Sequence, residues 1–198
     1  MKNCLKKLLK RDEGAVTVES SLIIMILIML TGGAIEAGYA FYQYNGAQQA
    51  ARTGVRIAAT SDPVSPSLNS VLEQGSSSNF EITCSDQTQR CSQGSYDSIA
   101  MRRIIFGPDE DGICGATSRL RRGMCDIFQD TTHAHVDVSY MSSGLGNAGT
   151  QGDAAPLISV TLREVPLNFV FLDLVGLGGV IHLPPVEATL MGEDLKNG

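Results

Sequence analysis

Residues 16–34 read VTVESSLIIMILIMLTGGA, and the nine positions at their centre, 22–30, are Leu, Ile and Met without a break. An α-helix rises 1.5 Å per residue, so nineteen residues nearly cross the roughly 30 Å hydrocarbon core of a bilayer. A helix on the surface of a soluble core normally keeps a polar stripe, and the centre of this run has none. The run therefore predicts a membrane-spanning helix.

The charges that flank this run predict its orientation. Arg52 and Arg56 are the basic residues that follow it within some twenty positions, whereas five basic residues precede it: Lys2, Lys6, Lys7, Lys10 and Arg11. Basic residues are retained on the cytoplasmic side of a membrane. We therefore expect a cytoplasmic N-terminus and place everything after about residue 40 outside the cytoplasm.

The sequence after the run favours a continuing helix over a secretory signal peptide, because no small-x-small cleavage site flanked by a turn follows closely. Residues 37–59 contain no proline, and small or apolar residues recur at helical spacing: Ala47, Ala51, Gly54, Val55 and Ala58. The sequence TSDP at 60–63 then ends the helix. We predict one helix over about 15–60, whose second half offers a small-residue face to a folded domain.

Composition predicts one folded domain beyond the anchor. The 198 residues are 43% hydrophobic and 18% charged, which is compatible with a folded chain. Removing residues 1–14 takes away five basic and two acidic residues and leaves ten against nineteen, a net charge of −9. So acidic a domain is a poor candidate for nucleic-acid binding, which needs clustered Lys and Arg. We divide the chain into a basic cytoplasmic leader (1–14), a transmembrane and assembly helix (15–60) and an extracytoplasmic domain (61–198).

Two carboxylates lie in or beside the apolar run. Glu19 is inside it, where an ionised carboxylate costs a few kcal/mol unless it is compensated, so we take it as a functional residue. Glu36 lies seventeen positions later, about 26 Å along a helix, and is expected to reach water at headgroup depth. A cut between Gly14 and Ala15 would create an α-amino cation one helical turn from Glu19. Geometry then permits a salt bridge to the subunit's own terminus or to that of a neighbour.

At this point the sequence resembles the TadE-like pseudopilins of the Flp, or Tad, pilus system. The resemblance covers residues 11–60, with a weaker one over 157–191. Its motifs are a basic leader ending in Gly, a small residue, Val-Glu at mature positions four and five, a Glu-x-Gly-x-Ala-Phe-Tyr segment and an Ala-Ala-Arg-x-Gly-x-Arg helix end. In this chain these are Gly14, Ala15, Val18 and Glu19; Glu36, Gly38, Ala40, Phe41 and Tyr42; and Ala50, Ala51, Arg52, Gly54 and Arg56. Ser20 departs from the pattern, since the family usually has Phe or Tyr there.

The resemblance implies a minor pilin of type IVb pili that is cut after Gly14 by a prepilin peptidase. Its implied partners are pilin and pseudopilin subunits, that peptidase, the inner-membrane pilus assembly platform and membrane lipid. The implied location is a single-pass inner-membrane protein with a cytoplasmic N-terminus and a C-terminal domain in the periplasm or in a surface pilus.

The outer domain carries four cysteines, Cys84, Cys91, Cys114 and Cys125, while Cys4 lies in the leader. In an oxidising compartment the four are disulfide candidates; three connectivities are open, and neighbours in sequence are the first guess. Strands are predicted over 133–140, 157–162, 169–175 and 186–190, a short helix over 98–106, and loops over 74–79 and 142–152. The predicted fold class is α+β: a long N-terminal helix followed by a small antiparallel, β-rich domain with disulfides.

No catalytic motif, cofactor site or metal site is evident in the sequence. His133 and His135 would share a strand face but lack a third ligand, and the acidic turn at 108–112 lacks the twelve-residue calcium-loop pattern. We therefore expect that the protein is not an enzyme. The alternative function is a permanently anchored envelope protein that binds a partner or ligand through its outer domain without polymerising. A third hypothesis is an anchored hydrolase, and it has the least support because no nucleophile motif is present.

Overall fold

The computed structural model describes residues 13–73, 80–108, 112–115, 122–143, 155–167, 169, 171–174, 176, 179 and 181–192. The chain forms two compact units. The first comprises residues 1–41 and 169–179, and the second comprises residues 42–168 and 180–198. The predicted loop at 74–79, residues 144–152 of the predicted loop at 142–152, and the core of the acidic turn, 109–111, lie outside the described residues. Ser142 itself ends a strand, so the second loop begins later than predicted.

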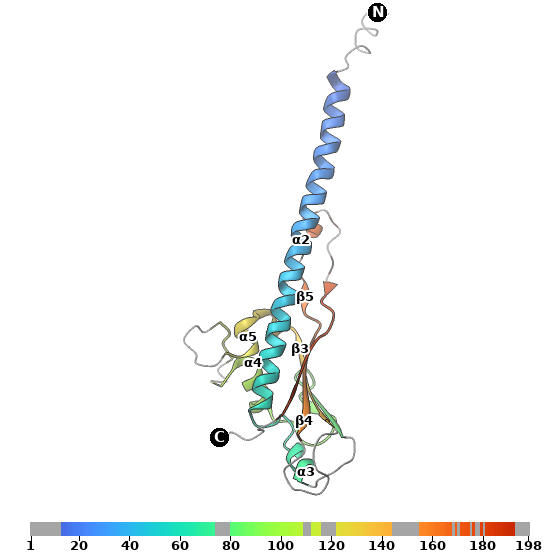
Figure 1. The fold of residues 1–198 in the computed structure, drawn as a ribbon. Coiled ribbons are helices and arrows are strands. Elements are labelled where there is room, and N and C mark those ends of the chain that lie inside the picture. The colour runs from blue at the N-terminus through green and yellow to red at the C-terminus, as the bar shows by residue number, and fades with distance from the viewer. Residues whose placement is uncertain are drawn as a thin grey trace, which may run out of the picture. The chain divides into compact units, whose positions relative to one another are not determined.

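Helix α2 (Glu13–Ala59) is 47 residues long and contributes to both units (Figure 1). The predicted continuous helix is therefore confirmed. It contains no proline, and it ends where Thr60 and Ser61 turn their hydroxyls back onto the carbonyls of its last turn. Among the described residues α2 is the one helix that is long and apolar enough to cross a membrane. It fits a single-pass membrane anchor.

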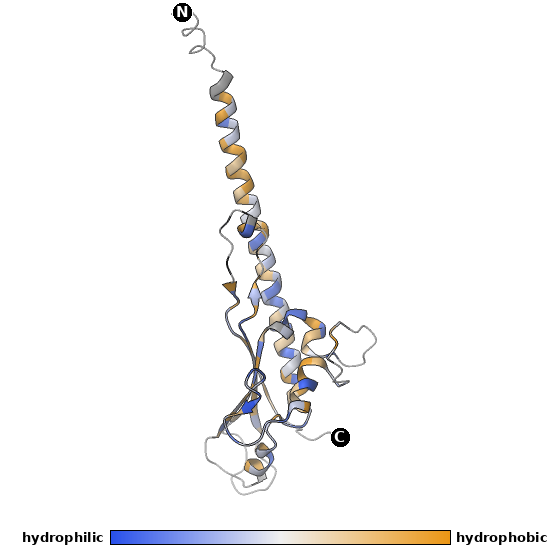
Figure 2. Cartoon of the chain, turned by 180° about the vertical axis from the view of Figure 1, so that it is seen from behind, coloured by the Kyte–Doolittle hydropathy of each residue, from blue (hydrophilic) through white to orange (hydrophobic). Residues whose placement is uncertain are grey.

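The first unit consists of α2 up to Phe41 and of the segment that carries the short helix α6 (Phe171–Leu174). Apolar side chains dominate α2 here, as the orange colouring of its N-terminal half shows (Figure 2). The strand predicted over 169–175 is wrong, because the chain forms α6 instead. A short apolar run carries no periodicity that separates a strand from a buried turn of helix, so the prediction had little support.

The second unit is built on an antiparallel sheet of five strands in the order β2-β1-β3-β4-β7. Every neighbouring pair in this sheet is antiparallel. The strands are β1 (Glu81–Ser85), β2 (Arg90–Cys91), β3 (His135–Ser142), β4 (Pro156–Arg163) and β7 (Val186–Met191). A separate antiparallel pair joins β5 (Pro166–Leu167) to β6 (Ile181–His182). The predicted α+β class is confirmed.

One face of the sheet supplies the core of the second unit. Alternate residues of β3 and β4 are fully buried, namely Val136, Val138, Tyr140, Ile158, Val160 and Leu162. The same period of two in the sequence predicted these strands, and β4 and β7 lie where they were expected. Strand β3 starts two residues later than predicted, because His133 belongs to the 3-10 helix η1 (Gln129–His133).

Helix α2 completes this core with its small-residue face, since Ala47, Ala50, Ala51 and Ala58 are fully buried. In the second unit α4 (Ser98–Phe106) and α5 (Met124–Ile127) lie to one side of α2 and the sheet lies to the other (Figure 1). Glycines let the neighbours approach closely: a Cβ on Gly46 would lie 2.9 Å from the Phe128 ring. The predicted helix over 98–106 is confirmed, and α3 (Ser67–Glu73) follows the end of α2.

Candidate assembly site

The N-terminal half of α2 exposes an unusual amount of apolar surface. Eleven apolar side chains between positions 16 and 30 are 46–68% exposed: Val16, Val18, Leu22, Ile23, Ile24, Met25, Ile26, Leu27, Ile28, Met29 and Leu30. Soluble monomers rarely carry a contiguous apolar patch of this extent. A patch of this kind marks a surface that contacts a membrane or another protein, and it fits a single-pass membrane anchor.

Hydroxyl groups inside this apolar stretch are satisfied by the helix itself. Ser20 Oγ donates to the carbonyl of Thr17 at 3.0 Å, and Ser21 Oγ donates to that of Val18 at 2.8 Å. Backbone carbonyls of the preceding turn are the usual acceptors for serine in a helix. The hydroxyl of Ser20 is therefore satisfied within the helix, and an apolar medium around it would meet no unpaired hydroxyl at this position.

Glu19 differs from these serines, because its carboxylate has no partner among the described residues of the chain. The side chain is exposed, and no described side chain lies in hydrogen-bond or ion-pair contact with it. The backbone of Gly14 and Ala15 lies in the first turn of α2. Ala15 and Glu19 are four residues apart on one helix, which makes them neighbours on the same face.

Glu36 is buried, contrary to the expectation that it reaches water. Its side chain is 7% exposed, and its carboxylate accepts hydrogen bonds from the backbone N–H groups of Phe171 and Leu172, the latter at 3.0 Å to Oε1. These amides open helix α6, so the carboxylate caps that helix with a charge of the favourable sign. Gly32, one turn earlier on α2, leaves room for the Phe171 ring: a Cβ there would lie 2.8 Å from it. Sequence reasoning missed this contact.

In the second unit the chain that leaves α2 is fastened at Val64. Its N–H donates to the hydroxyl oxygen of Tyr140 on β3 at 3.0 Å, and its carbonyl accepts from Asp97 N at 2.8 Å. Asp97 in turn caps α4, since its Oδ1 accepts from Ile99 N and Ala100 N. We call the contacts of Val64 with Tyr140 and Asp97 the Val64 junction. Burial raises the pKa of Tyr140 to about 12, although the bond from Val64 lowers it in part.

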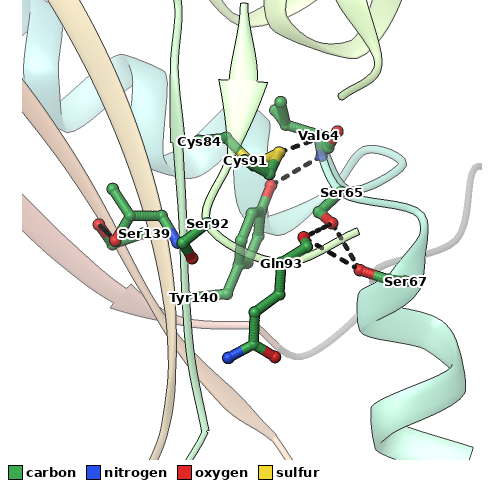
Figure 3. The surroundings of a disulfide bond; sticks show 10 residues. Val64, Ser65, Ser67, Cys84, Cys91, Ser92, Gln93, Ser139 and Tyr140 are labelled. Atoms are coloured by element: carbon green, nitrogen blue, oxygen red, sulfur yellow. Dashed lines mark hydrogen bonds between the residues drawn. A yellow bond between two sulfur atoms is a disulfide. The ribbon is translucent and has the colours of Figure 1, made fainter. Parts of the chain in front are cut away.

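A disulfide between Cys84 and Cys91 lies beside the Val64 junction (Figure 3). The Cys91 sulfur is 4.0 Å from the Val64 carbonyl oxygen; this is a packing contact, because a disulfide sulfur carries no hydrogen. Nearby, Ser65 Oγ donates to the carbonyl of Gln93 at 3.1 Å. The second disulfide joins Cys114 to Cys125. Each bond joins two cysteines that follow one another among the four of the outer domain, and both bonds lie in the second unit.

A polar cluster on the sheet is the other concentration of charge. Arg163 forms an ion pair with the buried Asp137, and His135 Nε2 lies 3.2 Å from Glu164 Oε2. Burial raises the pKa of Asp86, and His135 lowers it in part.

The described residues contain no group of three or more His, Cys, Asp or Glu side chains that could hold a metal ion. The predicted shared strand face of His133 and His135 is wrong, because His133 lies in η1.

Comparison with protein families identifies the N-terminal region. The model of the TadE-like protein family matches residues 14–56, which is less than a quarter of the chain but includes Gly14, Glu19 and Glu36. The resemblance of this segment to TadE-like pseudopilins is confirmed, and it supports a Tad pilus-associated role of the minor-pilin kind with partners in that system. Neither the curated proteins nor the solved structures gave a match.

Proposed function

Since residues 14–56 are TadE-like, we propose that the chain is a minor pilin-like subunit required for assembly of Tad pili, processed by a prepilin peptidase after Gly14. The observation that carries the proposal is Glu19. It is an exposed carboxylate without a partner among the described residues, on an apolar helix, one turn after the scissile bond.

Processing would supply the missing partner. Cleavage leaves an α-amino cation on Ala15, about 6 Å along the helix axis from Glu19. A charge pair is far stronger in a medium of low dielectric than at a protein surface, and it removes much of the cost of a lone carboxylate in lipid. When the amino group belongs to a neighbouring subunit, the same pair links the two helices in register.

The exposed apolar residues of α2 support the same role. A helix of this kind can pass from lipid to a filament interior without changing its surroundings much, because both are apolar. The basic leader, which carries five Lys and Arg residues, orients the N-terminus towards the cytoplasm and so towards a peptidase on that side. Within this proposal the outer unit is a structural or contact domain, and the protein is not an enzyme.

The test is complementation of a strain that lacks this gene, with pili counted by electron microscopy and subunits quantified in sheared fractions. Glu19→Ala and Glu19→Gln should abolish pili while the protein remains in the membrane, because both remove the charge. Ser21→Ala is the matched control: it removes a neighbouring hydroxyl that donates to the Val18 carbonyl within α2, and it should assemble normally.

Wild-type numbers of pili with Glu19→Ala would overturn the proposal. That result would favour the alternative of a permanently anchored envelope protein, for which Glu19 has no assembly role.

A further inference from the structure

Helix α6 is attached to α2 at a defined depth along the apolar run. Within the first unit, Glu36 holds the first N–H groups of α6, and Gly32 receives the Phe171 ring. Twenty residues separate Val16, where the apolar run begins, from Glu36, so the attachment lies about 30 Å along the helix. This equals the thickness of a hydrocarbon core. If α2 spans the membrane, α6 therefore lies at the outer membrane surface.

Exposed aromatic side chains on α2 lie close to the depth at which Glu36 binds α6. Tyr39 and Phe41, one turn beyond Glu36, are 47% and 71% exposed. Exposed aromatic residues that follow an apolar span are typical of the boundary between acyl chains and headgroups. They support the depth that the length of the run gives for α6.

The segment around α6 has the composition of an interfacial element. Residues 169–180 read FVFLDLVGLGGV, with a single charged residue, Asp173, which is exposed. Phe169, Phe171 and Leu172 remain partly exposed. A short helix at this depth needs its first N–H groups satisfied, because an unpaired backbone group in an apolar medium costs several kcal/mol. The carboxylate of Glu36 provides those acceptors.

We propose that the segment containing α6 is a second lipid contact, in which the side chains of Phe169, Phe171 and Leu172 enter the outer leaflet at the boundary between phospholipid headgroups and acyl chains. Glu36 and Gly32 hold it there. The inference rests on the membrane-anchor part of the proposed function. It makes the membrane contact of this chain bipartite: α2 crosses the bilayer, and a segment from near the C-terminus lies in its outer surface.

The absence of tryptophan from the chain allows a direct test. The full chain carrying Phe169→Trp is reconstituted into phosphatidylcholine vesicles whose lipids are brominated near the glycerol end of the acyl chain. We expect bromolipid to quench this tryptophan strongly and aqueous iodide to quench it weakly. Leu172→Trp is a second reporter in case the first variant does not fold. Phe41→Trp, at the aromatic boundary of α2, is the positive control.

Two outcomes overturn the inference when the Phe41→Trp control is quenched by lipid. Quenching of the reporter by iodide instead of lipid would place α6 in water. Quenching by neither would mean that protein covers it, either this chain or a second copy. Loss of lipid quenching from the Phe41→Trp control itself would overturn both the inference and the anchor on which the proposed function also depends.

The attachment is tested with a pair of glycine variants in the Phe169→Trp background. Gly32→Ala places a Cβ 2.8 Å from three atoms of the Phe171 ring, whereas Gly33→Ala meets nothing within 4 Å. We expect Gly32→Ala to lose most of the lipid quenching and Gly33→Ala to keep it. Equal quenching in the two variants would refute the role of Gly32 in holding α6.

Discussion

Tyr140→Phe tests the Val64 junction, which ties the exit of α2 to the sheet. The substitution keeps the ring and removes only the hydroxyl oxygen that accepts the hydrogen bond of Val64 N. Both residues are fully buried, so the freed N–H has no water to bond. A buried donor left unpaired costs about 1–3 kcal/mol. We expect the free energy of unfolding of the second unit to fall by that amount at pH 8.

The same variant predicts a distinct pH dependence. Burial raises the pKa of Tyr140 from its ordinary value of 10.0 to about 12. Between these values the unfolded state has lost the proton and the folded state has kept it, so stability falls as pH rises. The contribution is complete below pH 10 and is lost as pH rises towards 12; two pKa units correspond to about 3 kcal/mol. Tyr140→Phe lacks this loss, so its stability should approach that of the wild type with rising pH.

The assay is urea unfolding of the full chain in detergent micelles, followed by circular dichroism from pH 8 to pH 11. All proteins carry Cys4→Ser, which removes the leader thiol that could attack the disulfides at alkaline pH. Tyr96→Phe is the control. The pKa of Tyr96 is also raised to about 12, by burial and then by Asp86, but this side chain is more exposed and its effect should be smaller. A constant difference between Tyr140→Phe and wild type across the whole range would refute the reasoning.

Three further substitutions test the second unit by the same unfolding assay. Replacing Cys84 and Cys91 together by Ser opens a loop of sequence separation 7 and should cost about 2–3 kcal/mol; an unchanged midpoint would contradict a structural disulfide. Asp97→Ala removes the cap of α4 and should cost about 1 kcal/mol, whereas Asp97→Asn should retain most of it. Gly123→Ala would bring a Cβ within 2.4 Å of Phe106 backbone and should cost about 1–3 kcal/mol; wild-type stability would show that α5 and α4 do not approach so closely.

Local patterns in the sequence predicted the elements that depend on local chemistry. The apolar run and the absence of proline predicted α2, whose bounds, Glu13–Ala59, differ little from those expected. Alternation of apolar and polar residues predicted β4 and β7, and α4 lies over 98–106, where a short helix was expected. Each of these signals lies within the element that it predicts.

The contact of Glu36 with α6 could not be predicted in this way. Its partners are 135 and 136 positions away in the chain, and no local pattern links them. Glu36 was expected to reach water, because side chains at headgroup depth normally do. Its carboxylate instead accepts hydrogen bonds from the first N–H groups of α6. The apolar segment 169–175 offered no periodicity, so its short helix was mistaken for a strand. A carboxylate beside an apolar run needs a hydrogen-bond donor, and this need was the sequence signal for the contact.

In the proposed function, the Glu19 carboxylate pairs with an α-amino group that exists only after cleavage behind Gly14. The most direct measurement is the intact mass and N-terminal sequence of the full-length gene product, purified from membranes of cells that make a Tad-type prepilin peptidase. We expect a chain that begins at Ala15. A chain that retains Met1 and the basic leader in those cells would contradict it.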